Sequence, residues 1–192
     1  MNRLTAEEFR EARKMPLVVV LDDVRSLYNV GSVFRTCDAF RVEALFLCGI
    51  TATPPHVEIH KTALGAEEAV SWQYFKTADE AVAELKRRGY HTFAVEQAEG
   101  STKLQDLPTT LLSHRETAVP DQEDSRESRP AYAIVLGNEV KGVHQSVVDA
   151  CDGCLEIPQF GTKHSMNVAV TAGIVIWEFA RQTVLQADQQ GL

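Results

Sequence analysis

The stretch best suited to bind a ligand lies near the carboxyl end of the chain, between Ile157 and Asn167. A proline and a glycine break the backbone there, and four consecutive polar residues follow before Asn167 opens an apolar run. Continuation to Leu185 gives about twenty residues, which is the length of a helix rather than a strand. Ser165 or Asn167 could simply cap this helix, or the free N–H groups at its start could hold an anionic or carbonyl oxygen of a ligand.

Two earlier stretches also combine glycine with polar side chains. Asn29, Gly31 and Arg35 follow an apolar segment, and Arg35 lies one helical turn beyond Gly31 on a similar face. The segment Gly137 to Gly142 places Glu139 between two glycines in a tight loop. Arg35 could equally be a solvated helix arginine, and Glu139 a plain turn carboxylate.

The elements that must position these stretches alternate between strand and helix. The β-branched run Leu17 to Leu21 is typical of a parallel strand that is covered on both faces. Further strands are predicted at 44–48, 91–95, 132–136 and 153–157, and helices at 29–40, 56–63, 78–88, 144–150 and from Asn167 onward. Because ligands bind at the carboxyl ends of strands in such α/β proteins, the three polar stretches occupy the expected places for a site.

The bulk composition fits one compact domain with one insertion, since the chain has 192 residues, 44% hydrophobic and 24% charged. Its formal net charge of -8 means that any RNA partner must be held by a local basic patch. Four cysteines without an amino-terminal signal pattern indicate reduced thiols in a cytoplasmic protein. We see no apolar stretch approaching the roughly 20 residues of a membrane span and expect no membrane partner.

Two segments flank or interrupt the predicted core. Residues 1–16 form a helical extension that Thr5 caps, and residues 17–187 form the main domain. Residues 97–130 are rich in polar residues and proline, so they are expected to be a mobile surface loop. We expect no separate RNA-binding domain.

No metal site is expected. His56 and His60 stand four residues apart but lack a third ligand, so they are interpreted as surface histidines. Cys151 and Cys154 lack the second pair that a structural zinc site requires, so they are interpreted as packing residues.

Taken together and in order, the three stretches resemble the three motifs of the SpoU (TrmH-like) branch of the SPOUT RNA methyltransferases. The matching segments are Asn29–Arg35, Leu136–Gly142 and Ile157–Gly161 with Ser165–Ala169. Many relatives have Ser-Leu-Asn-Val-Ser in the third motif, where this chain has Ser-Met-Asn-Val-Ala. Methionine conserves the volume of leucine, and the missing hydroxyl at Ala169 does not touch the implied chemistry.

The resemblance implies an α/β knot: a parallel sheet with helices on both faces and a carboxyl-terminal trefoil knot. It implies that the second and third motif loops bind S-adenosylmethionine, and that the protein is a homodimer in which Arg35 acts across the interface. The residues carried over for the cofactor are Leu136, Gly137, Asn138, Gly142, Ile157, Pro158, Gly161, Ser165 and Met166.

The implied reaction is transfer of a methyl group from S-adenosylmethionine to a ribose 2′-hydroxyl of tRNA or rRNA. Its catalytic residues would be Arg35, Asn29, Glu139, Ser165 and Asn167. A guanidinium is a poor free base, so Arg35 would either relay the proton through a substrate phosphate or position phosphate and hydroxyl. Candidate RNA contacts are Arg10, Arg13, Lys14, Arg25 and Lys163.

Two alternatives remain. The chain could be a catalytically silent RNA-binding or assembly module that retains the fold. Against loss of catalysis, all five candidate residues are intact: Asn29, Arg35, Glu139, Ser165 and Asn167. A measurement of S-adenosylmethionine binding would distinguish the silent module from an active methyltransferase. A nucleotide-dependent oxidoreductase is disfavoured, because no G-x-G-x-x-G follows the first predicted strand.

Overall fold

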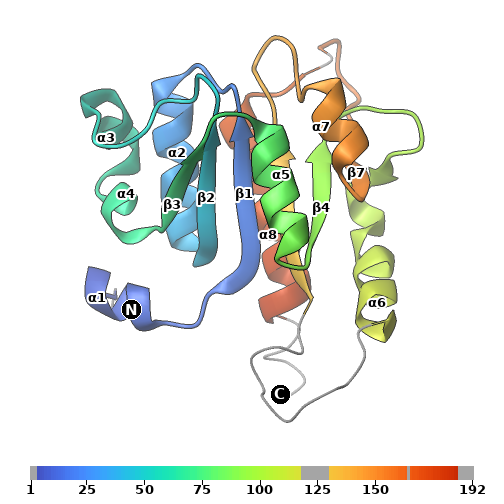
Figure 1. The fold of residues 1–192 in the computed structure, drawn as a ribbon, viewed down its shortest axis with the longest axis horizontal. Coiled ribbons are helices and arrows are strands. Elements are labelled where there is room, and N and C mark those ends of the chain that lie inside the picture. The colour runs from blue at the N-terminus through green and yellow to red at the C-terminus, as the bar shows by residue number, and fades with distance from the viewer. Residues whose placement is uncertain (1–3, 118–129, 164, 186–192) are drawn as a thin grey trace.

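A seven-stranded parallel sheet runs through the centre of the molecule, in the order β3-β2-β1-β6-β4-β7-β5 (Figure 1). The computed structural model describes residues 4–117, 130–163 and 165–185. The strands are β1 Met15–Asp22, β2 Val42–Cys48, β3 Trp72–Phe75, β4 Tyr90–Val95, β5 Thr102–Lys103, β6 Ala131–Leu136 and β7 Gly153–Glu156. Because all are parallel, their carboxyl ends lie along one edge of the sheet.

Helices cover both faces of this sheet (Figure 1). They are α1 Ala6–Glu11, α2 Leu27–Ala39, α3 Val57–Ala63, α4 Ala66–Ala69, α5 Ala78–Arg87, a 3₁₀ helix Leu104–Asp106, α6 Leu107–Thr117, α7 Gln145–Ala150, α8 Val168–Ala180 and a π-helix Arg181–Leu185. The predicted α/β class and the helices on both faces are confirmed. The trefoil knot and the domain limits stay predictions.

The interior strand β1 contributes to two apolar layers by the alternation of its side chains. Leu17, Val19 and Leu21 lie in one apolar cluster with residues of α2 and α8. Val18 and Val20 lie in a second cluster with residues of α5 and α7. A strand that is apolar on both faces is what a sheet covered on both sides requires, which is why its sequence shows no polar alternation.

The predicted amino-terminal helix is shorter than expected, since α1 ends at Glu11. Thr5 caps it as predicted: its hydroxyl accepts from the backbone N–H of Glu8, and the Glu8 side chain accepts from the backbone N–H of Thr5. This reciprocal pair satisfies two N–H groups that the first turn leaves free.

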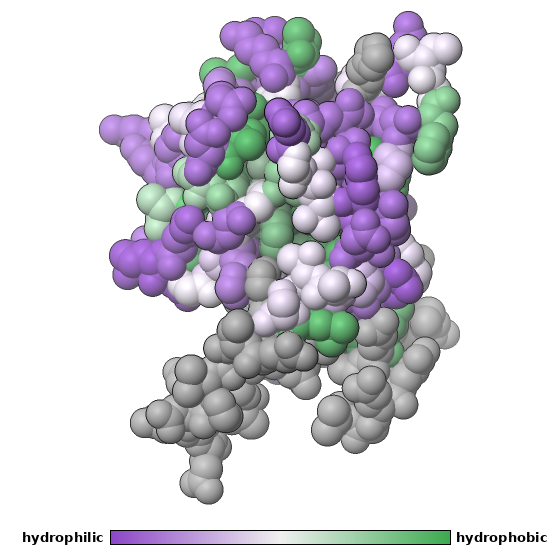
Figure 2. All heavy atoms as spheres, turned by 90° about the vertical axis from the view of Figure 1, so that its right-hand side faces the viewer, coloured by the Kyte–Doolittle hydropathy of each residue, from purple (hydrophilic) through white to green (hydrophobic). Residues whose placement is uncertain are grey.

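The expectation of an irregular loop over residues 97–130 is wrong in its first half, where β5, the 3₁₀ helix and α6 lie. Leu104, Leu107 and Leu111 are buried there, three and four residues apart, which is helical spacing. The surrounding polar residues hid this pattern. Figure 2 shows hydrophilic, intermediate and hydrophobic residues intermixed on the α6 side of the molecule. Residues 118–129 lie outside the described part of the chain.

The expectation about membrane spans also needs correction. Val168–Leu185 has a mean hydropathy of 1.3 over 18 residues, so its length and composition alone would suit a membrane span. In the structure Ala172, Val175, Ile176 and Phe179 of this segment are fully buried in the core. We therefore interpret α8 as a core helix, since a buried core helix can have the same length and apolar composition as a membrane span.

Candidate active site

A cavity of about 380 Å³ opens at the carboxyl edge of the sheet, among the ends of β4, β6 and β7 and the start of α8. Of the residues predicted to bind a cofactor, Leu136, Gly137, Asn138, Gly142, Ile157, Ser165 and Met166 line it, and so does Glu139. Pro158 and Gly161 do not line it, and Gly161 is exposed with open space around its Cα. The second and third predicted motifs therefore meet around one cavity.

Glycine is required on one wall of this cavity because two backbone segments touch there. A Cβ on Gly137 would lie 2.1 Å from backbone atoms of both Gly142 and Val143. Gly142 has φ +71°, and a Cβ there would lie 2.1 Å from a carboxylate oxygen of Glu96. The loop after β6 is thus folded back on itself, with paired backbone hydrogen bonds between Asn138 and Gly142 of 3.0 and 2.9 Å.

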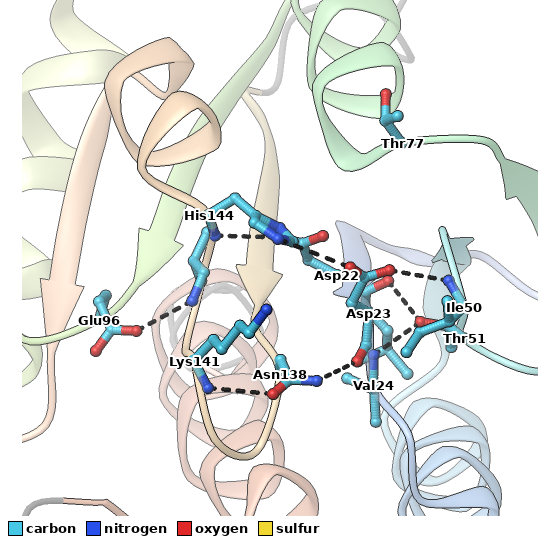
Figure 3. A network of polar contacts seen from close by, with 12 residues as sticks. Asp22, Asp23, Val24, Ile50, Thr51, Thr77, Glu96, Asn138, Lys141 and His144 are labelled. Carbon is cyan, nitrogen blue, oxygen red and sulfur yellow. Dashed lines mark hydrogen bonds and ion pairs between the residues drawn. The ribbon is translucent and has the colours of Figure 1, made fainter.

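Asn138 anchors this loop to the end of β1 (Figure 3). Its amide nitrogen donates to the carbonyl oxygen of Asp23 at 2.7 Å. Its amide oxygen accepts from the backbone N–H groups of Val140 and Lys141 at 2.9 and 3.1 Å. Asn138 therefore shapes the cavity wall by ordering the loop through both its amide nitrogen and its amide oxygen.

Glu139 joins the second motif to the first. Its carboxylate accepts from the backbone N–H groups of Arg25 and Ser26 at 3.1 and 3.0 Å, and from the side-chain amide of Asn29 at 3.2 Å. Partial burial alone would raise the pKa of this carboxyl. The hydrogen bonds from the backbone of Arg25, Glu139 and Ser26 and from the side chain of Asn29 outweigh it and lower the pKa. The site thus keeps Glu139 ionised.

Asn167 brings in the third motif. Its amide nitrogen donates to the side-chain oxygen of Asn29 at 3.1 Å, while its own oxygen caps α8 by accepting from Ala169 and Val170. A chain of side chains, Glu139 to Asn29 to Asn167, therefore links all three predicted motifs. Ser165 lines the cavity and makes no capping bond to a described residue. Of the two predicted N-cap residues of this helix, Asn167 is therefore the one that caps it.

A polar cluster that sequence reasoning missed lies behind the same loop (Figure 3). The buried Asp22 carboxylate accepts from the backbone N–H of His144 at 3.2 Å and contacts its Nδ1 at 2.9 Å. Asp23 lies 3.7 Å from the other ring nitrogen. The hydrogen bond and the negative charge of Asp22 raise the pKa of His144. The ligand atoms of these three side chains lie close enough to hold a metal, but Asp22 already pairs with His144, and Asp23 accepts from the backbone N–H of Ile50 at 2.9 Å.

Arg35 does not reach the cavity of its own chain. It is exposed on α2 and forms no hydrogen bond or ion pair with another described residue. Gly31 allows a close approach of backbone, and the backbone that approaches is that of α3: a Cβ would lie 2.1 Å from the hydroxyl of Thr62 and 2.3 Å from the carbonyl oxygen of Ile59. The structure thus brings Asn29, Glu139, Ser165 and Asn167 together and leaves Arg35 apart.

The candidate RNA contacts fall at two places. Arg10, Arg13 and Lys14 precede β1 and lie at the opposite edge of the sheet from the motif loops (Figure 1). Lys14 donates to the carbonyl of Phe9, and Arg10 donates to the carbonyl of Glu68 at 3.4 Å. Arg25 and Lys163 are exposed, and of the five only these two lie in loops at the edge of the sheet where the motif loops are: Arg25 between β1 and α2, and Lys163 between β7 and α8.

Several residues that line the cavity lie outside the three predicted motifs. Val95, Glu96 and Gln97 lie at the end of β4, and Thr171 lies in the first turn of α8. The residues at the end of β4 reach the cavity because β4 lies between β6 and β7 in the sheet. Periodicity in the sequence does not reveal this strand order. Thr171 stands four residues after Asn167, so helical spacing could have indicated it.

Comparison with known proteins identifies relatives over most of the chain. A model of the SpoU rRNA Methylase family matches residues 16–177. A 23S rRNA (guanosine-2′-O-)-methyltransferase RlmB of Neisseria meningitidis serogroup B is 31% identical over 174 residues, which are 91% of this chain and 62% of the relative. The chain thus spans about three fifths of the length of the curated relatives it first matches.

Solved structures share the fold. The A. aeolicus TrmH/SpoU tRNA modifying enzyme superposes with a TM-score of 0.72 at 25% identity, covering 97% of this chain and 84% of that one. An AdoMet-bound rRNA methyltransferase from Sinorhizobium meliloti superposes with a TM-score of 0.70 at 23% identity, covering 92% and 60%. The family match covers the three motif segments and the cavity they line, and this chain belongs to the SpoU rRNA Methylase family.

Proposed function

We propose that this protein transfers a methyl group from S-adenosylmethionine to a ribose 2′-hydroxyl of tRNA or rRNA. The observation that carries the proposal is the hydrogen-bonded chain Glu139–Asn29–Asn167, which joins the three motifs beside the cavity. A relative named as a guanosine-2′-O-methyltransferase of 23S rRNA and a structural neighbour named as a tRNA modifying enzyme support the substrate class.

The cavity suits a folded cofactor of this type. It has the volume of a small-molecule site and combines apolar walls from Leu136, Ile157 and Met166 with backbone polar groups of the loop after β6. Ser165 and Thr171 add hydroxyl groups to its lining. S-adenosylmethionine would supply a methyl group activated by its sulfonium. The chain's own task is to hold an RNA hydroxyl in line with that methyl group.

We assign Arg35 to positioning the RNA phosphate and the reacting hydroxyl. A guanidinium stays protonated and offers five donors in a fixed fork, which suits a phosphate and not a proton acceptor. Asn29, held by Glu139 and Asn167, fixes the start of the helix that carries Arg35. Glu139 is therefore proposed to act through Asn29, as a positioning residue.

We propose a homodimer that places the partner subunit's Arg35 beside each cavity. The support is a face of α8 on which Val170, Ile174 and Trp177 are 54%, 38% and 47% exposed, at helical spacing. Gly173 lies on the same helix with open space around its Cα, which would allow close approach of another helix. Large apolar side chains gathered on one helix face are typical of an interface. We also propose that the protein acts in the cytoplasm, where its RNA substrates are.

Isothermal calorimetry with S-adenosylmethionine tests the cofactor assignment. We expect binding to the purified full chain, abolished in Gly137→Phe because the new side chain displaces the loop that forms the cavity wall, and kept in Gly161→Ala. A folded wild-type protein that binds no S-adenosylmethionine would overturn the enzyme assignment and favour a silent RNA-binding module.

A further inference from the structure

A second groove, of about 510 Å³, lies between α2 and α3 and shares no lining residue with the cavity. Its polar lining consists of Ser32, Arg35 and Thr36 from α2 and Lys61 and Thr62 from α3. We call it the α2–α3 groove. Arg35 does not line the cavity, but in this groove it lies near a second cation and three hydroxyl groups.

Close packing of the two helices builds this groove. Because Gly31 has no side chain, the backbone of α3 fits against α2: a Cβ on Gly31 would lie 2.3 Å from the carbonyl oxygen of Ile59. The Thr62 hydroxyl then donates across the interface to the carbonyl of Tyr28 at 2.9 Å. Lys61, next to Thr62, is thus placed beside Arg35 by a rigid helix pair.

The charge of the α2–α3 groove is suited to an anion. Arg35 has no ionic partner among the described residues, and the Lys61 ammonium uses one donor on Glu58, at 2.6 Å. The Lys61 ammonium also contacts the Tyr28 hydroxyl, so at most one of its three donors remains for a ligand. Two cations against one carboxylate leave a local positive charge on a chain whose formal net charge is -8. This is the local basic patch that an acidic RNA-binding protein needs.

The hydroxyl groups of the groove add a second kind of recognition. Ser32 donates its proton to the carbonyl of Tyr28 at 2.8 Å, and Thr36 donates to the carbonyl of Ser32 at 3.0 Å. With their protons committed, these oxygens offer only acceptor lone pairs to a ligand. An acceptor suits the 2′-hydroxyl of a ribose, which distinguishes RNA from DNA, and does not suit a phosphate oxygen.

We propose that the α2–α3 groove binds the ribose-phosphate backbone of the RNA next to the nucleotide that is methylated, with Lys61 as a phosphate-positioning residue. The inference rests on the proposed function, because it takes Arg35 to contact the reacting nucleotide. Lys61 and Arg35 would hold neighbouring phosphates, while the Ser32 and Thr36 oxygens would accept from a ribose hydroxyl.

The test compares Lys61→Ala, Lys61→Arg and a matched control, Arg87→Ala. Arg87 is an exposed helix cation that, like Lys61, pairs with a glutamate three residues earlier, Glu84 at 2.7 Å. It differs in place, because α5 ends at the edge of the sheet opposite to the motif loops. Binding of bulk tRNA to the full-length protein is followed by fluorescence anisotropy between about 50 and 200 mM salt. Methyl transfer to the same tRNA, and binding of one oligoribonucleotide and its deoxyribose counterpart, are measured alongside.

We expect Lys61→Ala to weaken tRNA binding about 5-fold and to lower the slope of log affinity against log salt by about 1. KM for tRNA should rise with kcat little changed, while Lys61→Arg and Arg87→Ala behave like wild type. Equal affinity and slope for Lys61→Ala and Arg87→Ala would overturn the assignment of Lys61. Equal wild-type affinity for the ribose and deoxyribose strands would overturn the ribose contact.

The outcome for this groove and for the proposed function can be told apart. Wild-type protein that binds tRNA through Lys61 but transfers no methyl group would overturn the function and keep the groove. Wild-type protein that methylates RNA with binding independent of Lys61 would overturn the groove alone. Protein that binds no tRNA at any salt concentration would overturn the groove as well.

Discussion

Among single residues, Arg35 differs from Asn29, Glu139 and Asn167 because no hydrogen bond or ion pair to a described residue holds it. Its side chain is exposed. Arg35→Ala should therefore leave the folded state and the affinity for S-adenosylmethionine nearly unchanged while it abolishes methyl transfer. Calorimetry and a transfer assay on the same preparation check this, and substantial residual turnover would show that another residue positions the hydroxyl.

Glu139 has the opposite character, since its carboxylate is held by three donors from the loop before α2 and from Asn29. In Glu139→Gln one oxygen becomes an NH₂ group that faces a donor, so we expect a loss of about 1 kcal/mol in the free energy of unfolding. The partial exposure of Glu139 keeps this loss small, because water can reach the unpaired groups. Urea denaturation at pH 7 measures it.

The pH dependence of the Glu139 contribution follows from the sign of its shift. The pKa of the folded state is lowered, so the carboxylate stabilises the fold fully above the unfolded pKa of about 4.3 and loses this effect as pH falls through the folded value. The stability difference between wild type and Glu139→Gln should therefore shrink below about pH 4. A difference that stays constant down to pH 3 would argue that ionisation of Glu139 contributes nothing.

At the scale of elements, the loop after β6 depends on glycine where two backbone segments touch. In Gly137→Ala the new Cβ meets backbone atoms of Gly142 and Val143, which cannot rotate away, so the loop must shift. We expect a loss of about 1–3 kcal/mol in stability and much weaker cofactor binding. Gly161→Ala is the control, because nothing lies within 4 Å of its Cβ position. Equal cofactor affinity in both variants would contradict this account of the loop.

The elements that the sequence predicted well are those whose burial dictates their composition. β1 and β6 are continuous apolar runs because both faces of the sheet are covered, and their predicted limits differ from the structure by at most two residues. β3 was not predicted, because it is an edge strand whose Trp72 and Tyr74 are exposed and show no buried pattern. β5 has two residues, too few for any periodicity.

The candidate site was predictable to the extent that its residues lie within local motifs. The spacing of Gly137 and Gly142 is visible in the sequence, and so is the cap at Asn167. The contact between Asp22 and His144 joins residues 122 positions apart, and the cavity wall from β4 depends on the strand order. Contacts of this kind are set by the topology of the sheet, which single-sequence patterns do not specify.

At the scale of the whole molecule, the proposed dimer explains why Arg35 and the cavity are separate in one chain. Ile174→Glu places a charge in the exposed apolar face of α8, so it should convert the protein to a monomer and lower methyl transfer. Val57→Glu is the control, since Val57 is 72% exposed on α3, away from that face. Sedimentation equilibrium measures the mass, and circular dichroism checks the fold. A wild-type monomer with full activity would contradict the shared site.

The proposed reaction places the methyl group on a ribose 2′-oxygen. Purified wild-type protein is incubated with bulk tRNA or rRNA and S-adenosylmethionine labelled in its methyl group, and the RNA is then hydrolysed with alkali. A methylated 2′-oxygen cannot attack the neighbouring phosphate, so we expect label in alkali-resistant dinucleotides. Label that appears only in mononucleotides, as methylation of a base would give, or no label in the RNA at all, would contradict the proposed reaction.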